Sequence, residues 1–502
     1  MSKVDEYKVN ADGVPAHIQL KEEPESFVLR YEVNRPEIKT ATEAVLKDLK
    51  EQIVRKVDLS TEEFVNSREI ETVRQKFRDQ ALELLEDELP ETNEQAKKIL
   101  IGNLIHEMLG LGDIEILLND ENLEEIVINS ADEPVWVYHK EEGWLKSDVE
   151  FKDDDEIKNY ASDIGRRVGK NISSLHPLLD AHLPSGDRTN ATLYPISTQG
   201  NTITIRKFAR DPWTITDFVE NGTVSKEVAA FLWLCMQYEM NVLVSGGTGA
   251  GKTSMLNVLM PFIPPSQRIL SIEDTREVQL PEFLHWVPLT TREPNPEGKG
   301  GVSMLDLLVN ALRMRPDRIL VGEIRRKRQA EVLFEAMHTG HSVYSTLHAD
   351  TAEQTVRRLI NPPINVPKTM VEAVDVNLVM FRDRRRNFRR AMELAEISLD
   401  EETEEVEANV LYEWQSRNDE MEKKQESSSI YETLRMHAGM TDKEIDESIQ
   451  EKKEILDWMI ENDVNEVDTV GTVVAEYYDS KEDVVEVVKE NGDLSDISRK
   501  EK

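Results

Sequence analysis

The chain has 502 residues, which at about 150 residues per domain predicts three or four folded units. Lys and Arg number 61 against 98 Asp and Glu, a net charge of −37, which argues against a surface built as a whole for nucleic acid or anionic lipid. The single cysteine, Cys235, excludes an intrachain disulfide and a multi-cysteine zinc site. No stretch approaches the roughly 18 uninterrupted apolar residues of a spanning helix, and the first residues lack the apolar core of a signal peptide. We therefore expect a soluble intracellular protein.

The acidic excess is unevenly distributed along the chain. Residues 201–399 carry a net charge of +2, whereas residues 400–502 carry −20. A salt-rich cytoplasm would acidify every exposed surface, so the concentrated excess favours an acidic face directed at a partner. However, a middle region that needs arginine and lysine for interfaces and a phosphate site would be near neutral in either case. A partner-directed acidic face and adaptation to a salt-rich cytoplasm therefore both stay open.

The pattern of apolar residues predicts four segments in chain order. An amphipathic helix is expected over residues 61–89 and a second helix over residues 101–112, where Gly110 and Gly112 end it. Short β-rich runs predict strands at residues 123–129, 135–139 and 202–206. The segments are an N-terminal variable region (1–94), a smaller α/β domain (95–212), a domain of alternating strands and helices as in a parallel sheet (213–399), and an acidic helical C-terminal region (400–502).

A phosphate-binding loop is predicted at residues 246–253, which match the pattern G-x-x-x-x-G-K-[ST]. A strand is expected directly before it, over residues 241–245, and Lys252 can begin a helix. Glycines let backbone N–H groups close around phosphates, and the helix N-terminus adds a partial positive charge. Lys252 reaches the β- and γ-phosphates, and the hydroxyl of Thr253 can bind Mg²⁺. The predicted phosphate site comprises Gly246, Gly247, Thr248, Gly249, Ala250, Gly251, Lys252, Thr253 and Ser254.

Three further predicted strands lead into polar residues at the edge where a nucleotide binds. Glu273 follows strand 268–272, Glu323 follows strand 318–321, and His348 follows strand 342–346. The carboxyl ends of parallel strands share one edge of the sheet. Glu323 is therefore placed to orient or deprotonate the water that attacks the γ-phosphate. Each acid alone would be an ordinary strand-end residue, but beside a phosphate loop the pair predicts a catalytic edge.

These four motifs, in this order, resemble those of the type II/type IV secretion ATPase superfamily. Its members are hexameric motors for pilus assembly or retraction, secretion, DNA transfer and archaellum rotation. The implied fold is α/β, with a RecA-like P-loop motor domain, a smaller N-terminal domain before it and a helical acidic tail after it. The resemblance implies that Glu323 is the catalytic base, that Glu273 supports the metal or the water, and that His348 senses the γ-phosphate. The matching motifs are the Walker A loop (246–253), the Asp box (272–277), the atypical Walker B segment (315–325) and the His box (339–349).

The resemblance extends to residues before the phosphate loop, and two further features indicate which branch of the superfamily the chain is similar to. Residues 180–190 and 203–208 are similar to family segments whose arginines reach nucleotide held by the motor domain, which makes Arg188 and Arg206 candidates. On the motif alone, surface arginines are an equally good interpretation. A single cysteine rules out the four-cysteine zinc subdomain of many bacterial members, and the tail after Met440 is similar to archaeal members. An archaeal pilus, archaellum or secretion ATPase is therefore expected.

The resemblance also implies partners. We expect a homo-hexamer that hydrolyses ATP with Mg²⁺ in the cytoplasm, at the inner face of the cell membrane. The force would be delivered to a polytopic integral membrane platform protein. The acidic tail would dock to a basic surface of that partner, or would only keep the ring soluble.

Two other function classes stay open. The basic run at residues 382–390 could grip a nucleic-acid backbone, as in a DNA-transfer translocase, but its acidic surroundings disfavour DNA and a hairpin surface or subunit contact is the commoner role. A catalytically idle structural ring is the third class, and the intact Lys252 and Glu323 argue against it. These residues do not decide between pilus, archaellum and secretion, nor the direction of work.

Overall fold

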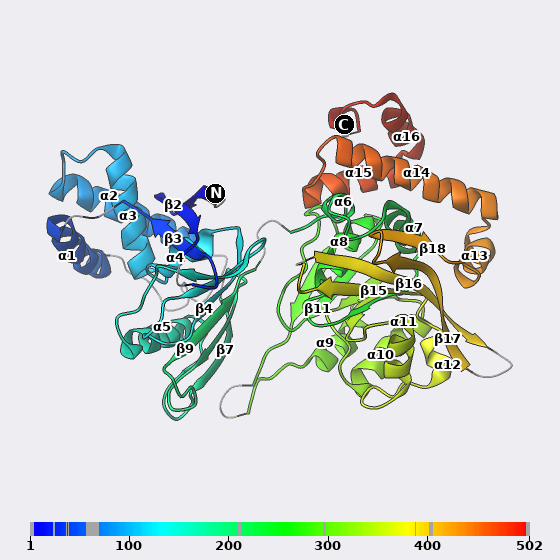
Figure 1. Ribbon diagram of the computed structural model, residues 1–502, viewed down its shortest axis with the longest axis horizontal. Helices are drawn as coiled ribbons and strands as arrows, with labels where there is room; N and C mark the ends of the chain where they lie inside the picture. Colours follow the sequence, from blue (N-terminus) through cyan, green and yellow to red (C-terminus); the bar gives the residue numbers. More distant parts are fainter. Residues whose placement is uncertain are drawn as a thin grey trace. The chain divides into compact units, whose positions relative to one another are not determined.

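The computed structural model describes residues 5–23, 26–36, 38, 40–56, 70–183, 185–208, 212–294, 298–386, 388–400 and 405–497 (Figure 1). The chain forms two compact units, residues 1–210 and residues 211–502. The described part of each unit contains one nine-stranded sheet. None of the helices in the described ranges combines the length and the apolar character that a membrane crossing needs.

The first unit is built on a mainly antiparallel sheet in the order β1-β2-β3-β6-β5-β4-β9-β8-β7. Buried and half-buried side chains alternate along β2, so that Ala16, Ile18 and Leu20 point into the core. Strands from the first 94 residues therefore complete the sheet of the segment that follows. The strands are β1 (Asp5–Ala11), β2 (Val14–Lys21), β3 (Arg30–Asn34), β4 (Leu123–Ile128), β5 (Trp136–His139), β6 (Gly143–Ser147), β7 (Leu178–His182), β8 (Arg188–Thr192) and β9 (Thr202–Arg206).

Three helices of the first unit, α1 to α3, enclose a separate apolar cluster that includes Leu49, Phe77 and Leu104. The predicted amphipathic helix is confirmed as α2 over its described part, and residues 61–69 lie outside the described residues. The second predicted helix is confirmed as α3, which starts earlier than expected because the side chain of Asn93 caps it, accepting the N–H of Ala96. The helices are α1 (Thr40–Lys56), α2 (Ile70–Glu88), α3 (Glu94–Met108), α4 (Ile114–Asn119) and α5 (Asp154–Arg167).

The sheet of the second unit has the order β12-β11-β13-β14-β10-β15-β16-β17-β18. The first six strands in this order, from β12 through β10 to β15, pair in parallel. From β15 to β18 the neighbouring strands are antiparallel. Every residue of β10, β11, β13 and β14 is buried, as expected for parallel strands covered on both faces. The strands are β10 (Val242–Gly246), β11 (Ile269–Glu273), β12 (Trp286–Thr290), β13 (Arg318–Val321), β14 (Ser342–Leu347), β15 (Val376–Asp383), β16 (Phe388–Asp400), β17 (Glu405–Gln415) and β18 (Glu420–Lys423).

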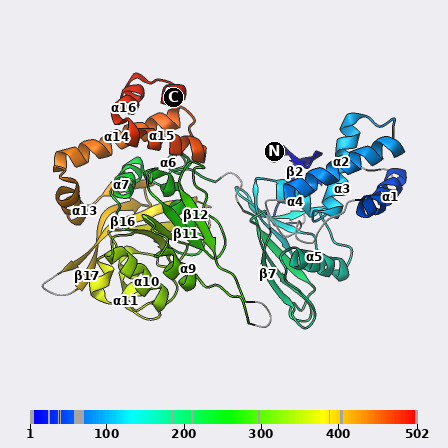
Figure 2. The ribbon, with the colours of Figure 1, turned by 180° about the vertical axis from the view of Figure 1, so that it is seen from behind.

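Helices cover both faces of this sheet (Figure 2). One face packs against α6 (Ile215–Glu220), α7 (Lys226–Gln237), α8 (Lys252–Leu259) and the short 3₁₀ helix η1 (Met260–Phe262). The other face packs against α9 (Met304–Ala311), α10 (Lys327–His338), α11 (Ala352–Ile360) and α12 (Lys368–Val371). The predicted parallel α/β domain is therefore confirmed.

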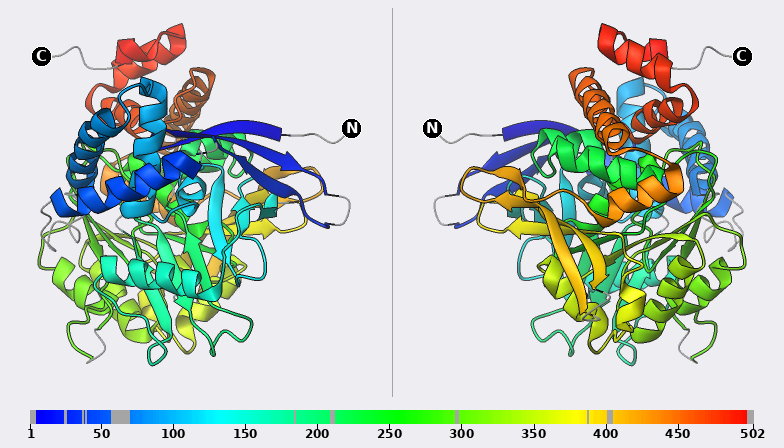
Figure 3. Two further views of the ribbon diagram at one scale, coloured as in Figure 1. Left: turned by 90° about the vertical axis from the view of Figure 1, so that its left-hand side faces the viewer. Right: turned by 90° about the vertical axis from the view of Figure 1, so that its right-hand side faces the viewer.

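The last helices pack on the outer side of α6 and α7 and belong to the same apolar core as α7 and α8 (Figure 3). They are α13 (Ser429–Thr433), the π-helix η2 (Leu434–Ala438), α14 (Asp442–Glu461), α15 (Val467–Asp479), α16 (Lys481–Glu490) and α17 (Leu494–Ile497).

The beginning of the C-terminal region differs from the helical structure that the sequence predicted. Residues 405–423 contain strands β17 and β18, and the helices start only at Ser429. The high charge of this region masked a run rich in strand-forming side chains, among them Val410, Tyr412 and Trp414. These strands extend the sheet of the second unit, because eight residues of β17 pair with β16 between Glu405 and Glu413.

Candidate nucleotide-binding and active site

The phosphate loop lies between β10 and α8, as the sequence predicted. Gly246 has φ of 149°, and a Cβ atom there would lie 2.4 Å from the carbonyl oxygen of Met380 on β15. Gly249 and Gly251 also have positive φ, at 72° and 89°. Only glycine fits the first of these positions without displacing the neighbouring strand, and the other two adopt backbone angles that side chains disfavour. The loop therefore offers an open backbone cradle of the kind that receives phosphates.

Lys252 is buried at the start of α8, with 8% of its surface exposed. Its Nζ donates a hydrogen bond of 2.9 Å to the carbonyl oxygen of Gly247 and lies 3.3 Å from Nδ1 of His348. Burial lowers the pKa of Lys252, and the negative charges of Glu323 and Asp350 oppose that shift. The ammonium thus faces the inside of the loop, where phosphate oxygens would replace the carbonyl as its partner.

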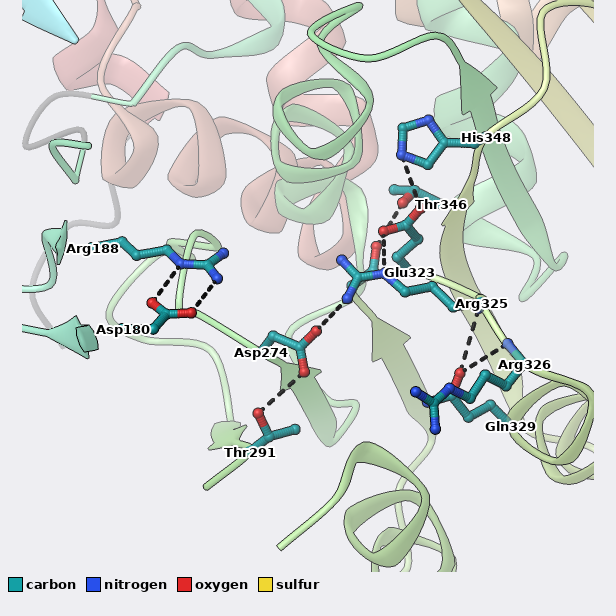
Figure 4. Close-up of polar contacts among 11 residues, drawn as sticks. Asp180, Arg188, Asp274, Thr291, Glu323, Arg325, Arg326, Gln329, Thr346 and His348 are labelled. Carbon is teal, nitrogen blue, oxygen red and sulfur yellow. Dashed lines mark hydrogen bonds and ion pairs between the residues drawn. The ribbon is translucent and has the colours of Figure 1, made fainter. Parts of the chain in front are cut away.

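Glu323 follows β13 and makes two polar contacts through its carboxylate (Figure 4). Its Oε1 lies 3.0 Å from Nε2 of His348, and its Oε2 accepts a 2.7 Å hydrogen bond from Nε of Arg325. Arg325 also donates to Oδ2 of Asp274 at 2.8 Å, and Asp274 accepts from Thr291 at 3.1 Å. One arginine therefore joins the end of β13 to the end of β11.

His348 joins the lysine to the glutamate. Partial burial, followed by the charge of Lys252, lowers the pKa of His348 below its ordinary value, so its ring is neutral at neutral pH. In the tautomer that satisfies both neighbours, Nδ1 accepts from Lys252 and Nε2–H donates to Glu323. Of the residues that the sequence placed on this edge of the sheet, Glu323 and His348 are thus in direct contact, and His348 also contacts Lys252 of the phosphate loop.

Glu273 ends β11 and is almost fully buried. Its Oε1 accepts the backbone N–H groups of Glu277 and Val278 at 2.9 and 3.1 Å. Its Oε2 is buried and has no hydrogen-bond partner among the described residues. Burial raises the pKa of this carboxyl to about 7. An unpaired carboxylate oxygen has the chemistry that Mg²⁺ prefers, since this ion binds oxygen ligands and keeps several waters.

Two arginines that sequence reasoning did not assign to this site lie against the phosphate loop. Arg389 donates from Nε to the carbonyl oxygen of Gly249 at 3.2 Å, and a guanidinium nitrogen of Arg382 lies 2.7 Å from where a Cβ of Gly249 would be. They face each other across the hairpin of β15 and β16, so the hairpin interpretation of the basic run is confirmed. No local pattern in the sequence locates them, because their position depends on the pairing of β10 with β15, which puts Gly246 opposite Met380.

Arg188 and Arg206 both lie in the first unit. They are direct partners in the register of β8 and β9, and Arg188 donates to the carboxylate of Asp180 through Nε at 3.2 Å and a second nitrogen at 2.8 Å (Figure 4). Arg206 faces Glu125 on the neighbouring strand β4. Their predicted contact with nucleotide stays a prediction.

Comparison with known proteins identifies relatives along most of the chain. Residues 107–477 match the family described as type II/IV secretion system protein. The uncharacterized protein MJ0900 of Methanocaldococcus jannaschii, an archaeon, is 35% identical over 383 residues, which cover 75% of this chain and 69% of that one. The type IV secretion system protein PtlH of Bordetella pertussis is 31% identical over 300 residues, which cover 53% of this chain and 87% of that one.

Among solved structures, similarity extends to the VirB11 ATPase of the Brucella suis type IV secretion system, at 26% identity and a TM-score of 0.30 over 56% of this chain and 90% of that one. The Legionella pneumophila ATPase DotB is 21% identical, with a TM-score of 0.41 over 57% of this chain and 80% of that one. The family match and the relative from M. jannaschii confirm the resemblance that the motifs indicated. The chain therefore belongs to the type II/IV secretion system protein family and is an ATPase of that family.

Proposed function

We propose that this ATPase is a hexameric motor that powers an archaeal pilus, an archaellum or a related secretion machine. The observation that supports it best is the continuous contact from Lys252 through His348 to Glu323. That contact connects the residue that holds phosphate to the residue placed to act on water. A change at the γ-phosphate therefore has a physical route to the base and to the end of β13.

Each residue of the contact has a separate task in this proposal. Lys252 and the N–H groups of the loop bind the phosphates of ATP. Glu323 holds the attacking water and accepts its proton, and Arg325 keeps the carboxylate oriented. When Lys252 turns from Gly247 and His348 to a phosphate, the imidazole gains freedom to move Glu323. On the family resemblance, we propose that Arg188 and Arg206 contact the nucleotide held by the motor domain.

We propose Mg²⁺ as the metal that acts with ATP at this site. Thr253 at the first turn of α8 and the unpaired Oε2 of Glu273 are the groups that would hold it, directly or through water. Bound Mg²⁺ would neutralise charge on the phosphates during transfer. Glu273 keeps its orientation through the two backbone N–H groups on Oε1, which leaves Oε2 for this task.

The decisive experiment compares ATP turnover by the wild type and by Glu323→Gln, with oligomer mass recorded with and without ATP and Mg²⁺. We expect the variant to bind ATP and to lose about 10² to 10⁴-fold in turnover, because it cannot accept the proton. Glu331→Gln is the matched control, since Glu331 lies on α10 and pairs with Lys327. Full activity of Glu323→Gln would show that the base is another residue, and a monomer with ATP would contradict the ring.

We also propose that the protein works in the cytoplasm, at the membrane, and that its acidic C-terminal helices dock to a basic surface of an integral membrane platform protein. Deleting residues 400–502 would remove β17 and part of the core, so charge removal is the cleaner test. Changing exposed Glu461, Glu486 and Glu490 to Gln should weaken binding to membranes that carry the platform, and flatten its salt dependence. Binding that is unchanged at low salt would contradict the docking proposal.

A further inference from the structure

Helix α15 rests directly on the segment that follows Glu273. A Cβ atom on Gly471 of α15 would lie 2.4 Å from Cγ of Pro281, so the helix and the segment touch without room for a side chain. One turn earlier on α15, Oδ1 of Asp468 accepts the backbone N–H of Glu282 at 2.8 Å. The C-terminal helices therefore hold residues 277–284, here called the Glu273 segment, at its far end.

The near end of the Glu273 segment is attached to the active site. The N–H groups of Glu277 and Val278 bind Oε1 of Glu273, and the N–H of Gln279 binds Oδ1 of Asn257 at 2.9 Å. Asn257 is a buried residue of α8, the helix that begins with Lys252. Residues 277–282 thus connect the carboxylate of Glu273 and the phosphate-loop helix α8 to the surface of α15.

Apolar packing makes this connection stiff. Val278, Leu280 and Leu284 of the Glu273 segment are buried in the same cluster as Val470, Val473 and Val474 of α15. Close-packed side chains of this kind do not deform gradually, so a displacement of α15 would move the segment with it. This cluster and the hydrogen bond between Asp468 and Glu282 thus tie the position of the Glu273 segment to that of α15.

We propose that Asp468 and Gly471 are positioning residues for Glu273, through which the C-terminal helices set the rate of ATP hydrolysis. The inference rests on the proposed role of Glu273 in the hydrolytic step. Asp468 holds the backbone of Glu282, and Gly471 allows α15 to sit on Pro281. Together they keep the N–H groups of Glu277 and Val278 on one oxygen of the carboxylate and leave the other oxygen free for its task.

The test uses the full chain and four variants. Asp468→Ala removes the bond to Glu282, whereas Asp468→Asn keeps an oxygen that can accept it. Gly471→Ala places a methyl group against Pro281. Asp496→Ala is the matched control, because Asp496 on α17 accepts a backbone N–H, that of Asp493, away from the Glu273 segment.

We expect Asp468→Ala and Gly471→Ala to lower kcat about fivefold, the equivalent of one hydrogen bond, with the KM for ATP changed less than about twofold. Hydrogen exchange at the amides of residues 277 and 278 should become faster in both. Asp468→Asn should restore kcat, and Asp496→Ala should leave both readouts unchanged. The inference is overturned by wild-type kcat in Asp468→Ala, by an Asp468→Asn as slow as the alanine variant, or by an equal loss in the control. A wild type without turnover would refute the proposed function, and this inference with it.

Discussion

Lys452 is a fully buried lysine in a region whose surface is strongly acidic, and its removal should stabilise the protein. It lies on α14, where Nζ donates to Oγ of Ser448 at 2.8 Å and to the hydroxyl of Tyr477 at 3.2 Å. The same nitrogen lies 4.8 Å from the centre of the Tyr477 ring and 5.7 Å from that of Trp233. Burial, followed by the charge of Lys481, lowers the pKa of Lys452 from 10.5 to about 7.

The pKa of Lys452 sets how much stability the substitution gains and how that gain depends on pH. A lysine with a pKa of 10.5 unfolded and about 7 folded costs the native state about 4 kcal/mol at pH 7. Between pH 7 and pH 10.5 the unfolded chain binds more protons, so stability rises with pH; below pH 7 both forms are charged and the cost stays constant. Replacing Lys452 with Met removes the cost and loses two hydrogen bonds of about 1 kcal/mol each. We expect a net gain of about 2 kcal/mol at pH 7, which falls to zero near about pH 9 and becomes a loss of about 1 kcal/mol at pH 10.

Calorimetric melting of the full chain measures this gain. The transition that ADP shifts upward belongs to the nucleotide-binding unit, since a ligand stabilises the unit that binds it. Lys452→Met should raise the Tm of that transition by about 5 °C at pH 7. Lys443→Met is the matched control, because Lys443 lies on the same helix with 84% of its side chain exposed. A lower Tm for Lys452→Met at pH 7, or a gain over wild type that does not fall between pH 7 and pH 10, would refute the reasoning.

Three further predictions concern the motor unit. Gly246→Ala forces a Cβ onto the carbonyl of Met380, so nucleotide binding should weaken more than about tenfold while the melting of the first unit stays unchanged. Glu396→Ala removes the buried carboxylate that accepts from the hydroxyls of three consecutive serines, Ser427, Ser428 and Ser429, and should lower stability by about 3 kcal/mol in urea unfolding. Arg389→Ala removes the hydrogen bond to Gly249 and should raise the KM for ATP several-fold without changing Tm, whereas Arg385→Ala in the hairpin turn should change neither quantity.

The parts of the site that could be predicted are those whose signal is local. The phosphate loop is one continuous run of residues with a strand before it and a helix after it. Glu273, Glu323 and His348 each follow an apolar run short enough to be a buried strand. Because parallel strands end at a common edge, three separate local signals predict one cluster without any knowledge of the strand order.

The remaining features of the site and the fold depend on pairings between residues far apart in the sequence. Local patterns do not contain that information. Arg382 and Arg389 reach the phosphate loop because β15 lies beside β10, although 136 positions separate Gly246 from Arg382 in the numbering of the chain. Strands β17 and β18 were predicted as helix because charge, which both helices and exposed strands tolerate, outweighed a weaker strand propensity. Strand propensity is decided by neighbours, and here the neighbour is β16.

The contact between Asp468 and Glu282 shows most clearly why motifs alone do not identify every residue that supports an active site. Neither residue belongs to a recognisable pattern, and 186 positions separate them. The bond nevertheless acts on the Glu273 segment, whose other end carries two of the hydrogen bonds that orient a predicted active-site carboxylate. A motif identifies the groups that act on ATP, since their chemistry restricts the residue types. The residues that hold those groups in place need only a suitable donor, acceptor or absence of a side chain, so almost any sequence can supply them and only the structure identifies them.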